Sequence, residues 1–201
     1  MKKILVTYET MSGSTAEVAQ AVGEEIAGEG AQVDVLPLEK VNGLSAYDAV
    51  VLGAPMIMGW HRSAIGFLRS NRKALEHMPL AVFAMAMSLT ANGETAVKDV
   101  PLCVDPILAK PPRDPKHPTF RENYTNVSRY ASPILNAAAP ARPVSVAFFG
   151  GKLDTNRLKL LVKLFVIFVV QAPPGDRRNW QAIRSWASSL LPLFSTAAVA
   201  R

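Results

Sequence analysis

Cysteine is almost absent from the chain, since Cys103 is the only one among 201 residues. A single cysteine excludes an internal disulfide framework and any metal site built from several thiolates. This scarcity is typical of a reducing compartment, so we expect a cytoplasmic protein. The three histidines have no ligand-like spacing, and we therefore expect no metal site.

Acidic residues are scarce in the last quarter of the chain. From Arg142 onward there are nine lysines and arginines but two acids, while the whole chain carries a net charge of +6. This excess predicts an anionic partner, either a membrane surface or an acidic small molecule. A solvated basic face without a partner is the alternative. Nucleic acid fits less well, because the basic residues are not interleaved with aromatic ones.

No apolar run is long enough to cross a bilayer. Residues 157–170 would extend about 21 Å as a helix, less than the roughly 30 Å of a hydrocarbon core. Basic residues at one end of an apolar stretch are typical of a helix lying in the membrane interface. The sequence thus predicts an apolar-basic helix at about 155–171, which attaches the protein to the inner face of a membrane, or packs in the core or a homodimer.

Short apolar runs alternate with helical patterns along the chain. This alternation predicts one domain over residues 1–201, an α/β fold with a doubly wound, parallel sheet of five strands. The predicted strands are residues 3–9, 32–38, 47–55, 79–88 and 142–151. Besides the stretch at 155–171, the predicted helices are residues 15–30, 63–77, 123–139 and 177–191, with Pro133 expected to kink or divide the third.

Six prolines interrupt the pattern after the fourth predicted strand. They lie between residues 101 and 118, where they exclude regular helix or central strand through most of the segment. We expect residues 91–120 to form an insertion outside the core, either an ordered lid or a loop.

Small hydroxyl residues crowd one glycine where the first strand meets the first helix, in the sequence TMSGST. Hydroxyls and bare amides at a helix start can bind an anion, and Gly13 permits close approach of the backbone. The loop has no Lys or Arg. It also lacks the G-K-[ST] ending of a nucleoside triphosphatase loop and the G-x-G-x-x-G of a dinucleotide-binding fold, so it suits a monophosphate held without a metal. A simple helix cap is the alternative. The candidate residues are Thr10, Met11, Ser12, Gly13, Ser14 and Thr15.

This loop resembles that of the flavodoxin family, T/S-x-T-G-x-T, which binds the phosphate of FMN. Thr10, Ser12, Gly13 and Thr15 stand at the family positions, with serine in place of the central threonine. The resemblance implies a flavodoxin-like fold with FMN as cofactor. It covers nearly the whole chain apart from residues 91–120.

The loop after the third strand, APMIMGWHRSA, resembles one branch more closely, the menaquinone-dependent protoporphyrinogen dehydrogenases. The resemblance implies that this loop flanks the flavin ring, that Gly59 places a carbonyl beside flavin N5, and that the loop after the fourth strand meets the pyrimidine edge. His61 is a weak candidate for moving a proton. The implied ring contacts are Pro55, Met56, Ile57, Met58, Gly59, Trp60, Ser88, Leu89 and Thr90.

Two functions follow from the resemblance. The first is an FMN-dependent oxidoreductase that passes electrons from a protoporphyrinogen-like substrate to a quinone, for which a basic surface is suitable. The alternative is a flavodoxin-type electron carrier without a substrate of its own. Carriers of that type are usually acidic around the flavin, and this chain is basic.

Overall fold

The computed structural model describes residues 1–56, 59–153 and 175–199. Ile57, Met58 and the predicted helix at 155–171 lie outside the described residues. Among the described residues, no helix combines the length and apolar character needed to span a membrane.

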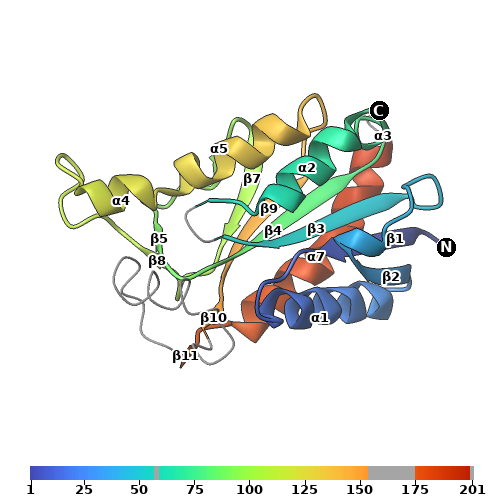
Figure 1. Ribbon diagram of the computed structural model, residues 1–201, viewed down its shortest axis with the longest axis horizontal. Helices are drawn as coiled ribbons and strands as arrows, with labels where there is room; N and C mark the ends of the chain where they lie inside the picture. The colour runs from blue at the N-terminus through green and yellow to red at the C-terminus, as the bar shows by residue number, and fades with distance from the viewer. Residues whose placement is uncertain (57–58, 154–174, 200–201) are drawn as a thin grey trace.

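Five parallel strands form the centre of the sheet, in the order β2-β1-β3-β4-β9 (Figure 1). Their apolar, β-branched runs suit strands with helices over both faces, and every residue of β3, β4 and β9 is buried. The order is that of flavodoxin-like doubly wound sheets. The strands are β1 (Lys3–Tyr8), β2 (Gln32–Pro37), β3 (Ala49–Pro55), β4 (Leu80–Ala86) and β9 (Ser145–Gly150).

Within the described residues the sheet already has seven strands, so the prediction of five is wrong. β7 (Val100–Val104) pairs in parallel with β9, and β6 (Ala96–Val97) pairs antiparallel with β7 at the edge. Pro101 is tolerated because the pairing with β9 begins only at the next residue. Part of the proline-rich segment therefore belongs to the sheet rather than lying outside the core.

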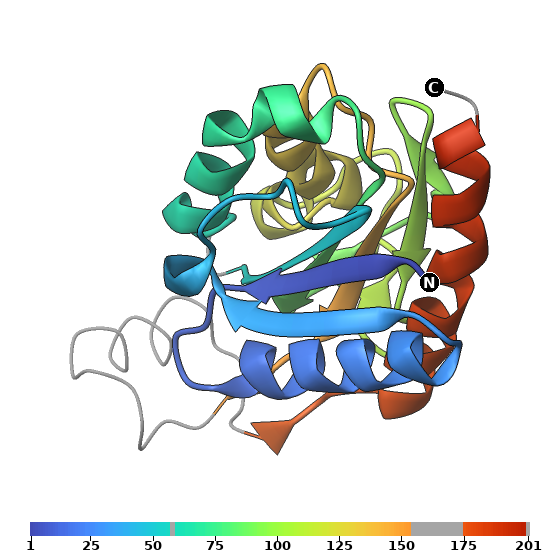
Figure 2. The ribbon, with the colours of Figure 1, turned by 90° about the vertical axis from the view of Figure 1, so that its right-hand side faces the viewer.

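Helices cover both faces of the sheet. α1 (Ser14–Gly28) and α7 (Trp180–Val199) lie on one face, and α2 (Arg62–Ser70), α3 (Arg72–Leu75) and α5 (Val127–Ala138) lie on the other (Figure 1, Figure 2). Alternate residues of each strand point to opposite faces, so the sheet separates two apolar clusters. This three-layer arrangement leaves the carboxyl ends of the strands as a place for loops.

The remaining elements are short. Between β2 and β3 the chain makes the 3-10 turn η1 and crosses to the other side of β1. A two-stranded parallel pair, β5 with β8, lies between β4 and α4 in the chain, and β10 pairs with β11. These elements are η1 (Leu38–Lys40), β5 (Leu89–Thr90), β8 (Ala109–Lys110), α4 (Phe120–Tyr124), β10 (Lys152–Leu153) and β11 (Gly175–Asp176).

The predicted helix at 123–139 is divided before Pro133, not at it. Asn126 accepts hydrogen bonds from the backbone N–H groups of Ser128 at 3.0 Å and Arg129 at 3.3 Å, and thereby starts α5. α5 then continues through Pro133. The N-cap rather than the proline separates α4 from α5.

α7 is fixed to the sheet by its aromatic face and to α1 by charge. The Trp186 indole donates to Ser145 Oγ at 3.0 Å and packs edge-on against two phenylalanine rings. Arg178 pairs with Glu17, and Arg184 pairs with Glu25 at 3.3 Å. Two of the basic residues counted in the last quarter are thus matched by acids on α1.

A buried carboxylate ties β7 to β9 and to the start of α7. Asp105 has no exposed surface. It accepts hydrogen bonds from the N–H groups of Ile107 at 3.0 Å and Gly150 at 3.4 Å, and from the Asn179 side chain at 3.1 Å. Three segments far apart in the sequence therefore meet at one side chain.

Cys103, two residues before Asp105, should react with iodoacetamide at higher pH in the folded protein than in the unfolded chain. Burial raises the pKa of its thiol, and the negative charge of Asp105 adds to this. Only the thiolate reacts, so the midpoint of the rate–pH profile moves upward. Stability should fall as the pH rises through this range, because the unfolded chain releases the thiol proton first. Mass spectrometry with and without urea gives both midpoints, and equal values would contradict the prediction.

Candidate functional site

Three loops meet at the carboxyl ends of β1, β3 and β4. The first loop is residues 10–15, the second 55–61 and the third 87–90. The Glu9 amide donates to the Gly53 carbonyl at 2.9 Å, and the Met56 amide donates to the Met85 carbonyl at 2.9 Å, which continues the pairing of these strands to their ends. The described candidate residues of the three loops therefore gather along one edge of the sheet.

The first loop is shaped by Gly13. Its φ is 90°, a left-handed conformation that favours glycine, and its amide donates to Thr10 Oγ1 at 3.0 Å. Gly13 is the N-cap of α1, and no side chain caps this helix. The amides of Ser14, Thr15 and Ala16 form no hydrogen bond to the described part of the chain. Simple capping therefore does not explain the hydroxyl residues.

Thr15 has the most informative hydroxyl of the first loop. Among the described residues, the buried side-chain polar atoms without a hydrogen-bond partner are the hydroxyls of Thr7 and Thr15. Leaving a buried hydroxyl unpaired costs about 1 to 3 kcal/mol. Thr7 lies within β1, whereas Thr15 lies in the first turn of α1 beside the free amides. A ligand with oxygen atoms at this helix start would satisfy both kinds of donor.

The second loop turns two of its apolar residues into the core. Met56 is 4% exposed and Trp60 is 8% exposed. The Trp60 indole donates to the Tyr130 carbonyl of α5 at 2.6 Å and packs edge-on against Phe148. Pro55, the last residue of β3, is also buried. The open ring surface expected from Met56 and Trp60 is thus covered by protein.

The remaining described residues of the second loop lie at its end. Gly59 has a φ of 123°, which favours glycine. His61 is the N-cap of α2, where its Nδ1 accepts from the Ser63 amide at 3.4 Å. The same nitrogen lies 3.8 Å from a carboxylate oxygen of Glu9, so the second loop comes close to the residue that precedes the first loop.

The third loop is partly buried. Leu89 is 1% exposed, and the Thr90 amide donates to the Thr125 carbonyl at 2.9 Å. The hydroxyls of Thr90 and Thr125 are 2.8 Å apart and hydrogen-bonded. Ser88 is half-buried, and its hydroxyl has no partner in the described chain. Of the three predicted residues here, Ser88 has the hydroxyl that remains available.

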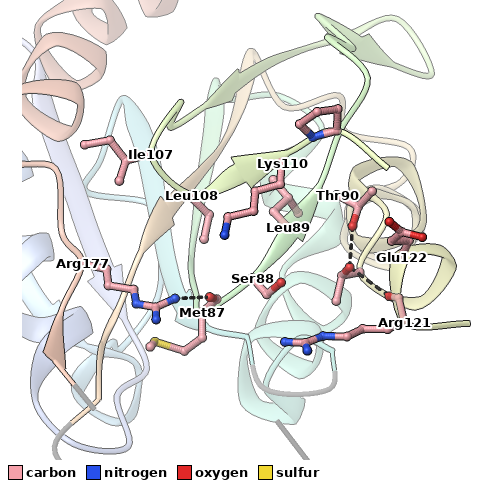
Figure 3. A pocket seen from close by; sticks show the side chains of 12 residues that line it. Met87, Ser88, Leu89, Thr90, Ile107, Leu108, Lys110, Arg121, Glu122 and Arg177 are labelled. Carbon is pink, nitrogen blue, oxygen red and sulfur yellow. Dashed lines mark hydrogen bonds between the residues drawn. The ribbon is translucent and has the colours of Figure 1, made fainter. Parts of the chain in front are cut away.

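Sequence reasoning missed a cavity of about 490 Å³ beside the third loop. Figure 3 shows Lys110, Arg121 and Arg177 reaching toward Ser88 from three separate segments. Arg177 is held there because its guanidinium donates to the Met87 carbonyl at 3.2 Å. A Cβ at Gly150 would collide with the Arg177 carbonyl, so this glycine lets the segment approach β9. The sequence signalled only one of these three cations: Arg177 belongs to the excess of basic residues after Arg142.

Residues 5–179 match a protein family described as "Flavodoxin domain". The chain belongs to this family. The resemblance seen in the first loop is therefore confirmed at the level of the family, and the observed strand order agrees with it. No curated protein sequence matches the chain.

Several solved flavodoxins are similar to this flavodoxin-family chain. An archaeal flavodoxin is 12% identical with a TM-score of 0.48, and the match covers 96% of this chain and 99% of that one. Oxidised flavodoxin 1 of Bacillus cereus is 12% identical with a TM-score of 0.49, over 95% and 98%. A Fusobacterium nucleatum flavodoxin variant bound to flavin mononucleotide is 17% identical with a TM-score of 0.31, over 42% and 52%. None of these matches points to the protoporphyrinogen dehydrogenase branch.

Proposed function

We propose that this protein binds FMN and transfers electrons, with the phosphate of FMN held by the first loop. When bound, FMN supplies redox chemistry that amino-acid side chains lack. Membership of the flavodoxin family and the three converging loops support the proposal. The observation that carries it is the buried, unpartnered hydroxyl of Thr15 beside the free amides of α1.

The donor set of the first loop fits a phosphate monoester. Amides at the start of α1 and the hydroxyls of Ser12, Ser14 and Thr15 are neutral donors, and the helix dipole adds about 0.3 to 1 kcal/mol toward an anion. Thr10 has a different task, because its hydroxyl accepts from Gly13 and holds the turn in shape. No cation is needed for this arrangement.

Other residues position the loops. The Glu9 carboxylate accepts from the Thr10 amide at 3.0 Å and lies 3.8 Å from the His61 ring, so the end of β1 approaches the second loop. Trp60, fixed to α5 by its indole, anchors the end of the second loop. We propose that Gly59 and Ser88, together with the first and second loops, border the flavin ring. Ile57 and Met58 are further candidates.

FMN should bind at least about 100-fold more tightly than riboflavin, which lacks the phosphate. Charge-assisted hydrogen bonds are worth about 1.5 to 3 kcal/mol each, so two of them would give such a ratio. Quenching of flavin fluorescence by the purified protein measures both constants. Equal affinities would remove the phosphate site from the proposal, and no uptake of either flavin would remove the cofactor.

A second candidate is a quinone-linked oxidoreductase acting on a protoporphyrinogen-like substrate. The specific observation in its favour is the cluster of Lys110, Arg121 and Arg177 beside the third loop, which suits an anionic substrate. This second function would also include attachment to a membrane surface, or formation of a homodimer, through residues 155–171. Oxidation of protoporphyrinogen by the FMN-loaded protein, with and without menaquinone, separates the two. FMN binding without turnover favours the electron carrier.

A further inference from the structure

The cavity beside the third loop is built from segments that the fold brings together. β5 pairs with β8, which places Lys110 opposite Thr90. α4 follows and contributes Arg121, while residues after β11 contribute Arg177. Its volume of about 490 Å³ lies within the range of pockets that hold small molecules.

Positive charge predominates in this cavity. Among the described residues that line it there are three cations, Lys110, Arg121 and Arg177, and one acid, Glu122. The Glu122 carboxylate already accepts from the Arg113 amide, the Thr119 amide and the Thr119 hydroxyl, each at 2.7 Å. These hydrogen bonds, that from Arg113 first, hold the pKa of Glu122 below its ordinary value. The Glu122 carboxylate is therefore occupied by hydrogen bonds from the start of α4 and from Arg113.

Figure 3 shows the Lys110 ammonium, the Arg121 guanidinium and the Ser88 side chain around the same part of the cavity. No residue of the described chain accepts a hydrogen bond from the Lys110 ammonium or from Ser88. An ammonium, a guanidinium and a hydroxyl facing one point can together hold a carboxylate or a similar anion.

The cavity also has an apolar wall. Leu89 is 1% exposed and Leu108 is 7% exposed, so both are firm parts of the core. Ile107, by contrast, is 68% exposed. An exposed isoleucine next to converging cations favours a ligand that has an apolar body as well as a charge.

The cavity is distinct from the phosphate site of the proposed function. Among the described residues, none of the first or second loop lines it, and the third loop is the described segment that borders both. Thr15 and the start of α1 follow β1, whereas the Arg177 segment of the cavity lies against β9. Two strands, β3 and β4, separate β1 from β9 in the sheet.

We propose that this cavity binds a small amphipathic organic anion, with its charge on Lys110 and Arg121 and its apolar part against Ile107 and Leu108. Binding does not require FMN, although such a ligand would exchange electrons with the protein only if the proposed function holds. Inorganic phosphate alone should bind poorly, because it cannot use the apolar wall.

The fluorescent aryl anion 8-anilinonaphthalene-1-sulfonate is a suitable probe, with N-phenyl-1-naphthylamine as its uncharged counterpart. Lys110→Gln and Arg121→Gln should each weaken binding of the anion about 3- to 10-fold, and added NaCl should weaken it further. Lys116→Gln removes an exposed lysine of the same segment that does not line the cavity, and it should change binding less than about 2-fold. Near-UV circular dichroism checks that each variant is folded.

Three results would overturn the proposal: equal effects of Lys110→Gln and Lys116→Gln, equal binding of the charged and uncharged probes, or complete displacement of the probe by FMN. The last would mean that the cavity is part of the flavin site. Unchanged FMN affinity in Lys110→Gln, together with weaker probe binding, supports a separate site. If the protein takes up no FMN but binds the probe through Lys110, the proposed function fails while this inference stands.

Discussion

Thr15→Val should lower the affinity for FMN about 10- to 100-fold and leave the cofactor-free protein as stable as before, or about 1 kcal/mol more stable. Valine keeps the shape and branching of threonine and removes only the hydroxyl. That hydroxyl is fully buried and unpartnered in the protein alone, so its loss removes a cost rather than a contact. With a phosphate bound it would donate to a charged oxygen, and the loss then becomes a penalty.

Thr7→Val is the matched control. Thr7 is equally buried, and its hydroxyl also lacks a partner, but it lies inside β1 and not at the helix start. We expect the same change in stability and no change in FMN affinity. Flavin fluorescence titration and urea unfolding measure the two quantities. A loss of affinity in both variants, or in neither, would show that Thr15 does not contact the phosphate.

Asp105→Ala should lower the free energy of unfolding by about 3 kcal/mol, because it leaves one buried and two partly buried donors without their acceptor, and an unpaired buried donor costs about 1 to 3 kcal/mol. The donors are the amides of Ile107 and Gly150 and the side chain of Asn179. For a chain of this size the melting temperature should fall by about 6 to 12 °C.

Asp105→Asn should be milder, since an amide oxygen can still accept from Ile107 and Asn179 on the side of Oδ1. Glu39→Ala, an exposed acid-to-alanine change in η1, serves as the control and should alter stability by less than about 0.5 kcal/mol. Urea unfolding followed by circular dichroism gives all three values. A loss below about 1 kcal/mol in Asp105→Ala would mean that water replaces the carboxylate at little cost.

Much of the central fold was predictable because its signals are local. The runs that became β1, β3, β4 and β9 are apolar over consecutive residues, as strands covered on both faces require. The prolines of residues 91–120 led to a wrong inference for β7. Proline excludes a backbone donor at one residue, whereas the pairing of β7 with β9 uses the residues after Pro101.

The first loop was predictable for the same reason, since its donors are contiguous and follow a recognisable strand. The second loop was less so. Met56 and Trp60 are apolar residues in a loop, which indicates a binding surface, but both are buried in the core, and Trp60 packs on Phe148 and donates to α5. Whether an apolar side chain faces a ligand or the core depends on packing partners that lie some seventy to ninety residues away in the chain.

The sequence by itself determined the order of the five central strands, the flavodoxin-like first loop and the uneven distribution of charge, because each depends on residues that are neighbours in the chain. The tertiary structure alone decided that Arg178 and Arg184 pair with α1 while Arg177 reaches the third loop. It also decided that Lys110 and Arg121 meet there, through the pairing of β5 with β8 and the approach of α4. Charges separated by tens of residues interact only when the fold brings them within a few ångströms, since solvent and salt screen them at longer range.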